Sequence, residues 1–280
     1  MKTEKNHVEE EHEAVRVASR KRLFAVSAII LLAVSSGIAY IYLAPTPVQP
    51  RFSLKAVIVD QLALNFPDPD FVQQASAYLN ASGFAVEYYY NETLDVEFFR
   101  NLTKGNYGIV ILRVHSALRS DNSSVDFFTA EPFNMTQHVS DRDNGLVVKG
   151  VLNYATGPKE YFGITPAFIE SLDRSFPKSI VVAMGCFSLK PDLKLMADAF
   201  MKRGAQAYIG WDNWVGPSHT DAETLNLLRW FSVWNATLSK AVSNTLPDPT
   251  FFGSRMRLYP ESAGDVRISD LIVDARSQSG

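Results

Sequence analysis

Hydrophobic positions fall into two patterns along the chain. Residues 23–43 form one uninterrupted apolar run, whereas after Leu54 short apolar runs alternate with segments of helical periodicity. Strand–helix alternation predicts an α/β domain over 54–280, with a doubly wound, mainly parallel sheet and helices on both faces. Residues 116–163 contain short strand-like runs and are expected to form a hairpin insertion. Strands are predicted at 54–60, 84–90, 107–114, 180–184, 205–211 and 268–273, and helices at 71–80, 93–103, 165–175, 191–203 and 219–244.

The run at 23–43 carries no charge and, at about 1.5 Å per residue, would extend about 31 Å as a helix, the thickness of a bilayer's hydrocarbon core. It is longer than the apolar region of a cleaved signal peptide, so it predicts an uncleaved transmembrane signal-anchor helix. Basic residues cluster in the polar segment 1–22, which is therefore expected to be a cytoplasmic tail. The proline-rich segment 44–53 is expected to be a stiff linker to an extracytoplasmic domain.

Six N-x-S/T sequons lie after the predicted span. About two would be expected by chance from the asparagine content and the roughly one-in-eight frequency of Ser plus Thr. The excess favours a glycoprotein with an external main domain, in a single-pass cell-membrane protein. The sequons begin at Asn80, Asn91, Asn101, Asn122, Asn134 and Asn235.

Composition excludes several other classes. The formal net charge is −3, so nothing suggests nucleic-acid binding. The chain has one cysteine, Cys186, which excludes an intrachain disulfide and a cysteine-based zinc site. No phosphate-binding loop or metal-binding motif is found, and no cofactor or metal is predicted.

Two apolar runs each deliver a reactive residue at a carboxyl end. The strand predicted at 107–114 is followed by His115, and the strand at 180–184 is followed by Gly185 and Cys186. Ligands and catalytic groups of open α/β sheets collect at the carboxyl ends of the strands. A thiol near an imidazole can act as a nucleophile, although a cysteine taken alone is more commonly a packed core thiol. The matching positions favour the catalytic interpretation.

The order and spacing of these segments resemble the caspase-like cysteine peptidases, which include caspases, metacaspases, legumain, gingipains and separase. The resemblance covers roughly 54–245. It implies that Cys186 is the nucleophile and His115 the general acid/base, with an oxyanion hole formed by the main-chain N–H groups of Cys186 and Ser116. The segments that carry it are 163–166 (GITP), 181–186 (VVAMGC), 197–200 (ADAF) and 203–211 (RGAQAYIGW).

Specificity in this family is usually set by a charged group in the pocket for the residue preceding the scissile bond. Asp212, between Trp211 and Trp214, is a candidate to bind a basic substrate side chain, and it could equally be a turn aspartate. His219 could line the cleft or belong to an ordinary helix start. Arg113 lies within a buried strand and must therefore be paired.

The sequence thus predicts a membrane-anchored, extracytoplasmic cysteine peptidase-like hydrolase that acts on a peptide or protein substrate and uses a Cys/His dyad. Transpeptidation is a variant of this hypothesis. The family usually has glycine after the histidine, where this chain has Ser116, so a catalytically inactive caspase-like domain that acts as an external binding or sensor module is the alternative. A flavodoxin-like binding domain is a second rival, weakened because the segment after the first strand is not glycine-rich.

Overall fold

The computed structural model describes residues 53–277, with the exception of residues 155 and 252. The expected cytoplasmic tail (1–22), the expected membrane span (23–43) and the linker up to residue 52 lie outside this part of the chain. Within it, no helix has the length and apolar character needed to cross a membrane.

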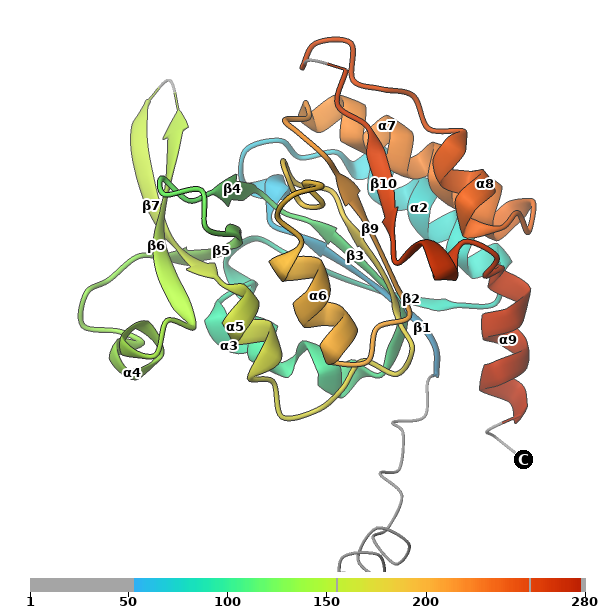
Figure 1. Ribbon diagram of the computed structural model, residues 1–280, viewed down its shortest axis with the longest axis horizontal. Coiled ribbons are helices and arrows are strands. Elements are labelled where there is room, and N and C mark those ends of the chain that lie inside the picture. Colours follow the sequence, from blue (N-terminus) through green and yellow to red (C-terminus); the bar gives the residue numbers. More distant parts are fainter. Residues whose placement is uncertain (1–52, 155, 252, 278–280) are drawn as a thin grey trace, which may run out of the picture. The chain divides into compact units, whose positions relative to one another are not determined.

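Six strands form a central sheet in the order β10-β9-β8-β3-β1-β2 (Figure 1). The pairs among β2, β1, β3, β8 and β9 are all parallel, and β10 pairs antiparallel with β9. The sheet is therefore mainly parallel, as the pattern predicts. The strand bounds are β1 Ser53–Asp60, β2 Ala85–Tyr90, β3 Tyr107–Arg113, β8 Ile180–Ala183, β9 Ala207–Trp211 and β10 Met256–Tyr259.

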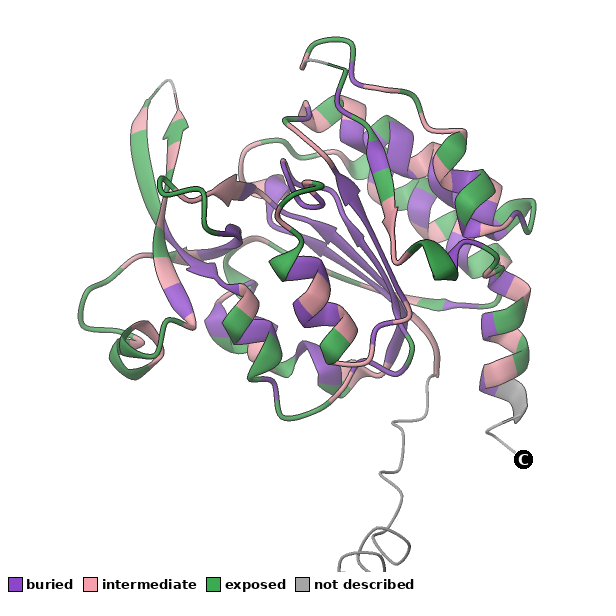
Figure 2. Ribbon diagram, in the orientation of Figure 1, coloured by how far each residue is buried: buried purple, intermediate pink, exposed green. Residues whose placement is uncertain are grey.

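Helices cover both faces of this sheet. Successive residues of a strand point to opposite faces, and in the central strands both sets of residues are apolar. Val110 and Val181 pack with residues of α3, α5 and α6. Ile111 and Val182 pack on the other side with residues of α2, α7, α8 and α9. Figure 2 shows the burial concentrated along the central strands. The helix bounds are α2 Pro69–Ala81, α3 Val96–Asn101, α5 Pro166–Glu170, α6 Leu195–Lys202, α7 Pro217–Leu228, α8 Leu238–Ser243 and α9 Ile268–Ser277.

The expected insertion forms a second, antiparallel sheet in the order β4-β5-β7-β6. β6 and β7 form the long hairpin at the left of Figure 1. One face of this sheet joins the core, since Phe127 and Ile164 are buried there with residues of α3 and α5. Its elements are β4 Ser116–Leu118, β5 Val125–Pro132, α4 Val139–Asp143, β6 Val147–Tyr154 and β7 Gly157–Ile164.

Two secondary-structure predictions are wrong. The helix expected over 219–244 is interrupted after a π-helical turn at Arg229–Val233, because Asn235 has a positive φ of 51° and Thr237 then caps α8 by accepting the N–H of Lys240. The strand expected at 268–273 is helix α9. Its buried residues, Ile268, Leu271 and Ala275, recur at helical spacing.

The order of the parallel strands reverses beside β1. The chain moves from β1 to its neighbour β2 in one direction and then to β3 on the other side. Such a switch point lies at the carboxyl ends of the strands and is the usual ligand site of open α/β sheets. Gln61, directly after β1, and His115, two residues after β3, both lie at this edge.

Candidate active site

His115 and Cys186 occupy equivalent positions at the carboxyl edge of the sheet. The last paired residues of β3 and β8 are Leu112 and Ala183, which lie opposite each other. His115 and Cys186 each follow three residues later. The sequence prediction that two buried strands end just before these residues is confirmed, and the structure makes the two strands neighbours in the sheet.

The two strand ends touch directly. The hydroxyl of Ser116 donates a hydrogen bond to the carbonyl oxygen of Cys186, at 2.5 Å. A Cβ atom at Gly185 would lie 2.6 Å from the carbonyl oxygen of Val114 and would also collide with the Ser116 hydroxyl. Only glycine allows this approach, so the residue before Cys186 helps to set how close the two loops lie.

The thiol of Cys186 is half-buried at the end of the sheet face covered by α2 and α7. It donates to the carbonyl oxygen of Val215, with an Sγ–O distance of 3.6 Å. Burial raises the pKa of this thiol, and the nearby carboxylate of Asp248 adds to the effect. In this structure the resting form of Cys186 is therefore the neutral thiol.

The His115 loop is held by its main chain. Its N–H donates to the side-chain oxygen of Gln61 at 2.9 Å, and its carbonyl accepts the N–H of Phe128 at 2.9 Å. The imidazole makes edge contacts with Phe66 and Phe128. Nε2 is buried and has no hydrogen-bond partner among the described residues.

Burial lowers the pKa of His115 to about 4, and the positive charge of Arg113 contributes to this shift. The ring is therefore neutral at neutral pH, and a neutral imidazole nitrogen can accept a proton. An unpaired, buried nitrogen at the switch point is consistent with a group that finds its partner only when a substrate is bound.

Arg113, two residues before His115, is paired as expected. Its guanidinium makes two hydrogen bonds of 2.7 Å to Asp221 on α7 and one of 2.6 Å to Asp60 at the end of β1. All three side chains are buried. Burial raises the pKa of both carboxyl groups and the Arg113 charge partly offsets this, while the two carboxylates raise the pKa of Arg113. The triad joins β1, β3 and α7 behind the site.

The residues predicted to bind substrate are spread over the β9–α7 connection. Asp212 accepts the main-chain N–H of Arg255 at 2.8 Å and forms an ion pair with Arg257 at 2.9 Å. Trp211 is fully buried and donates its indole N–H to Thr220. These contacts anchor Asp212 to β10 and Trp211 to α7, so neither side chain is free in this structure.

Trp214 and His219 lie nearer the surface. Trp214 is half-exposed and packs edge-on against Phe187, directly after Cys186, with the ring centres 5.0 Å apart. His219 Nε2 lies 3.1 Å from the carbonyl oxygen of Leu246, and its ring is 5.6 Å from that of Trp211. Of the residues predicted to bind substrate, Trp214 is thus the most exposed, and it lies next to the loop of Cys186.

The predicted oxyanion-hole donors are available. Among the described residues, the main-chain N–H of Cys186 donates no hydrogen bond to another residue. The main-chain N–H of Ser116 is also unused in this part of the chain, because Ser116 occupies a non-bonded position in the β4–β5 ladder. Two N–H groups at adjoining strand ends that no other residue uses are the arrangement that stabilises an oxyanion, although the Cys186 N–H also contacts its own thiol.

Sequence reasoning did not identify Gln61, Asp60, Asp221 or Asp248 as parts of this region. Gln61 and Asp60 are polar residues at a buried strand end, a signal that could have been used. Asp248 accepts the N–H of Gly216 at 2.8 Å and so holds the loop that carries Val215. No local pattern indicates that contact.

No group of three or more His, Cys, Asp or Glu side chains in the described residues is arranged to hold a metal ion. No protein-family model matches the chain, and no curated protein matches its sequence.

Proposed function

We propose that the chain is a cysteine peptidase-like hydrolase of the caspase-like type, with Cys186 as nucleophile and His115 as general acid/base. The observation that carries the proposal is the position of these residues at equivalent points after neighbouring strands, beside the switch point of the sheet. The neutral imidazole and the free N–H groups of Cys186 and Ser116 supply the other parts that acyl transfer needs.

The reaction would proceed in two steps. The Cys186 thiol gives its proton to His115 as its sulfur attacks the substrate carbonyl carbon, and the two N–H groups bind the oxyanion. The C–N bond then breaks, the amine leaves with the proton from His115, and a thioester remains on Cys186. Water, deprotonated by His115, hydrolyses the thioester. In transpeptidation an amine would take the place of water.

Cleavage after a basic residue remains a prediction. Arg257 already neutralises Asp212, so a lysine or arginine side chain would have to displace or share that ion pair. A membrane-anchored, extracytoplasmic location is part of the proposal. It is supported by the surface positions of the sequon asparagines, of which only Asn91 is as much as half-buried.

A second candidate function is a catalytically inactive module that binds an external ligand. Two observations favour it: the pKa of the Cys186 thiol is raised, and the thiol hydrogen-bonds Val215 rather than a base. A catalytically inactive protein could have the same fold without the catalytic activity, because the fold alone does not determine function.

Peptide cleavage by the full-length protein separates the two candidates. Mixed peptide libraries would be incubated with wild type, Cys186→Ala and His115→Ala, and the products read by mass spectrometry. The matched control is His138→Ala, which removes an imidazole that pairs with Glu131 and belongs to neither the proposed dyad nor the predicted substrate-binding residues. We expect losses of at least about 10²-fold for the first two variants and less than about tenfold for the control. Cleavage that survives in Cys186→Ala would overturn the proposal.

A further inference from the structure

β4 forms one edge of the second sheet, and its outer side is unpaired. It pairs only with β5, with Ser116 opposite Phe127 and Leu118 opposite Val125. Main-chain bonds flank this ladder, from Phe128 N–H to the His115 carbonyl and from Arg119 N–H to the Ser124 carbonyl, each 2.9 Å.

In an antiparallel pair, hydrogen-bonded and non-bonded positions alternate. Residues 115, 117 and 119 of the β4 segment are the bonded positions, so the N–H and C=O groups of Ser116 and Leu118 point away from β5. No other hydrogen bond in the described chain uses these four main-chain groups. β4 therefore presents the row of free donors and acceptors with which an extended chain can pair.

This free edge is continuous with the candidate active site. Ser116 directly follows His115 and supplies a proposed oxyanion-hole N–H, and its hydroxyl contacts the Cys186 carbonyl. A substrate whose scissile carbonyl binds at Ser116 would continue toward Leu118, two residues further along the same edge.

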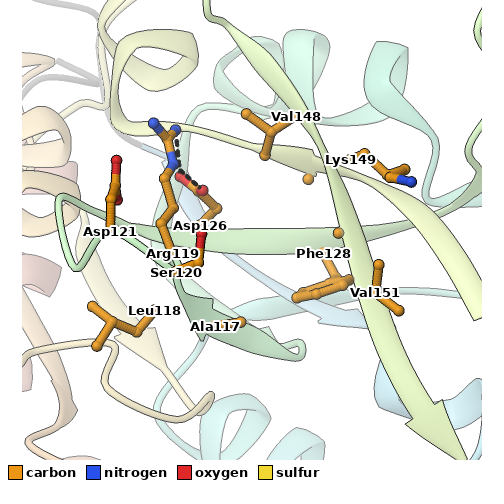
Figure 3. Close-up of a pocket in the computed structure, with 12 residues that line it drawn as sticks. Ala117, Leu118, Arg119, Ser120, Asp121, Asp126, Phe128, Val148, Lys149 and Val151 are labelled. Atoms are coloured by element: carbon orange, nitrogen blue, oxygen red, sulfur yellow. Dashed lines mark hydrogen bonds and ion pairs between the residues drawn. The ribbon is translucent and has the colours of Figure 1, made fainter. Parts of the chain in front are cut away.

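A pocket of about 460 Å³ opens beside β4 on the outer face of the second sheet (Figure 3). Its apolar lining includes Ala117, Leu118, Phe128, Val148 and Val151. Gly150 keeps space for the Phe128 ring, with which a Cβ atom would collide.

The charged side chains around the pocket already have partners. Arg119 forms two hydrogen bonds to Asp126, of 2.6 and 3.0 Å, and Lys149 pairs with Glu160. Asp121 accepts from the main chain and hydroxyl of Ser123. Because both cations are paired with carboxylates and much of the lining is apolar, the pocket suits an uncharged, apolar side chain.

We propose that the free edge of β4 binds an extended segment of the peptide substrate as an added strand, with one apolar side chain of the peptide in this pocket. The inference rests on the proposed peptidase function and specifies how that site selects its substrate. Residues opposite each other on paired strands point to the same face, and Ala117 lies on the pocket face opposite Asp126. The peptide residue opposite Ala117 would therefore enter the pocket, and the residues opposite Ser116 and Leu118 would face away from it. The apolar residue would then lie within about two positions of the scissile bond.

Backbone methylation of the peptide tests strand addition without altering the protein. The probes are fluorescein-labelled octapeptides of Ala and Ser that contain one Leu, and binding to full-length Cys186→Ala protein in detergent is read by fluorescence anisotropy. N-methyl groups placed at each position in turn should weaken binding about tenfold or more at alternate residues and little at those between. A loss that does not alternate would overturn the proposal.

Two protein variants locate the binding to β4. Leu118→Pro removes the outward N–H without taking a ladder bond, and Leu118→Ala is its matched control. Ala117→Phe fills the pocket. We expect about tenfold weaker binding with Leu118→Pro, near-wild-type binding with Leu118→Ala, and with Ala117→Phe the loss of the preference for Leu over Lys or Asp peptides. Thermal unfolding checks that each variant is folded. If Leu118→Pro does not fold, Ala117→Phe and the methylation scan show whether the peptide binds at β4.

The outcomes separate this inference from the proposed function. If wild-type protein cleaves peptides and Cys186→Ala does not, but methylation shows no alternation, strand addition at β4 is wrong and the peptidase function stands. If no peptide is cleaved yet binding alternates and depends on Leu118, β4 binds peptides in a protein without peptidase chemistry.

Discussion

The Ser116 hydroxyl donates a hydrogen bond to the carbonyl oxygen of Cys186 and so ties the loop that follows β3 to the loop that follows β8. The bond links the residue after the proposed general base to the proposed nucleophile itself. Its formation depends on Gly185, which leaves room for the Ser116 side chain. The geometry of the candidate dyad is therefore controlled by residues that are not themselves reactive.

Gly185→Ala should lower the unfolding free energy more than removal of the hydrogen bond from the Ser116 hydroxyl to the Cys186 carbonyl. The added methyl group would press on the Val114 carbonyl, which is main chain and cannot move aside cheaply, so we expect a loss of about 2–3 kcal/mol in unfolding free energy. Ser116→Ala loses only one hydrogen bond, for about 1 kcal/mol. Urea denaturation compares the two. Equal effects would contradict the close contact between the strands.

Arg113→Met should destabilise the fold by about 3–5 kcal/mol, because it leaves the buried carboxylates of Asp60 and Asp221 without their cation. Arg229→Met is the control, since the exposed Arg229 guanidinium donates hydrogen bonds, among the described residues, only to the hydroxyl of Tyr78 and should contribute less than about 0.5 kcal/mol. Urea unfolding at pH 7.5 measures both. A loss below about 1 kcal/mol for Arg113→Met would show that the triad is not buried as described.

His115 should make stability fall as the solution is acidified. Its pKa is about 4 in the folded protein and about 6.5 when unfolded, so between these values the unfolded state binds more protons. The contribution is complete above about pH 6.5 and is lost as the pH falls toward 4. At pH 5 we expect wild type to have lost about 2 kcal/mol more than His115→Gln, relative to pH 7.5.

This comparison is made by measuring the unfolding free energies of wild type and His115→Gln at pH 5 and at pH 7.5. Other titrating groups, including the buried Asp60, Asp126 and Asp221, are common to both proteins and largely cancel. If wild type and His115→Gln respond equally to acid, the imidazole is solvated rather than buried and neutral.

The thiol of Cys186 should react with iodoacetamide more slowly than a free thiol at neutral pH, because its pKa is raised. The rate should rise about tenfold per pH unit between pH 6 and 8, with no plateau. Cys186 is the only cysteine of the chain, so intact mass reports one site. A plateau below pH 7 would instead indicate a thiolate already stabilised by a cation in the free protein.

The sequence predicted the parts of this fold that rest on local patterns. The apolar runs at 107–114 and 180–184 are short and lack polar alternation, which predicted strands covered on both faces. His115 and Cys186 became candidates because they follow the ends of these runs. Asp68, followed by Pro69, is a typical helix-start signal, and its carboxylate caps α2 by accepting the N–H of Phe71.

Contacts between distant segments were not predictable in the same way. Arg113 had to be paired, but nothing local identified Asp221 as its partner 108 residues away. Asp212 was left open as a substrate-binding group or a turn aspartate, and nothing local identified its partner, Arg257 of an unpredicted strand. β10 was missed because its four residues are defined by pairing with β9 rather than by a local pattern. α9 was mistaken for a strand because Leu271, Ile272 and Val273 form a short apolar run, which periodicity alone does not assign to a strand or a helix.

Covalent labelling shows most directly whether Cys186 is a nucleophile that His115 assists. The full-length protein is treated with peptidyl acyloxymethyl ketones bearing Lys, Arg or Leu next to the reactive group, and the mass of the intact protein is measured. We expect one covalent adduct on wild type, none on Cys186→Ala and a much slower reaction on His115→Ala. A folded wild-type protein that none of the three probes labels would rule out the nucleophile and favour the binding module.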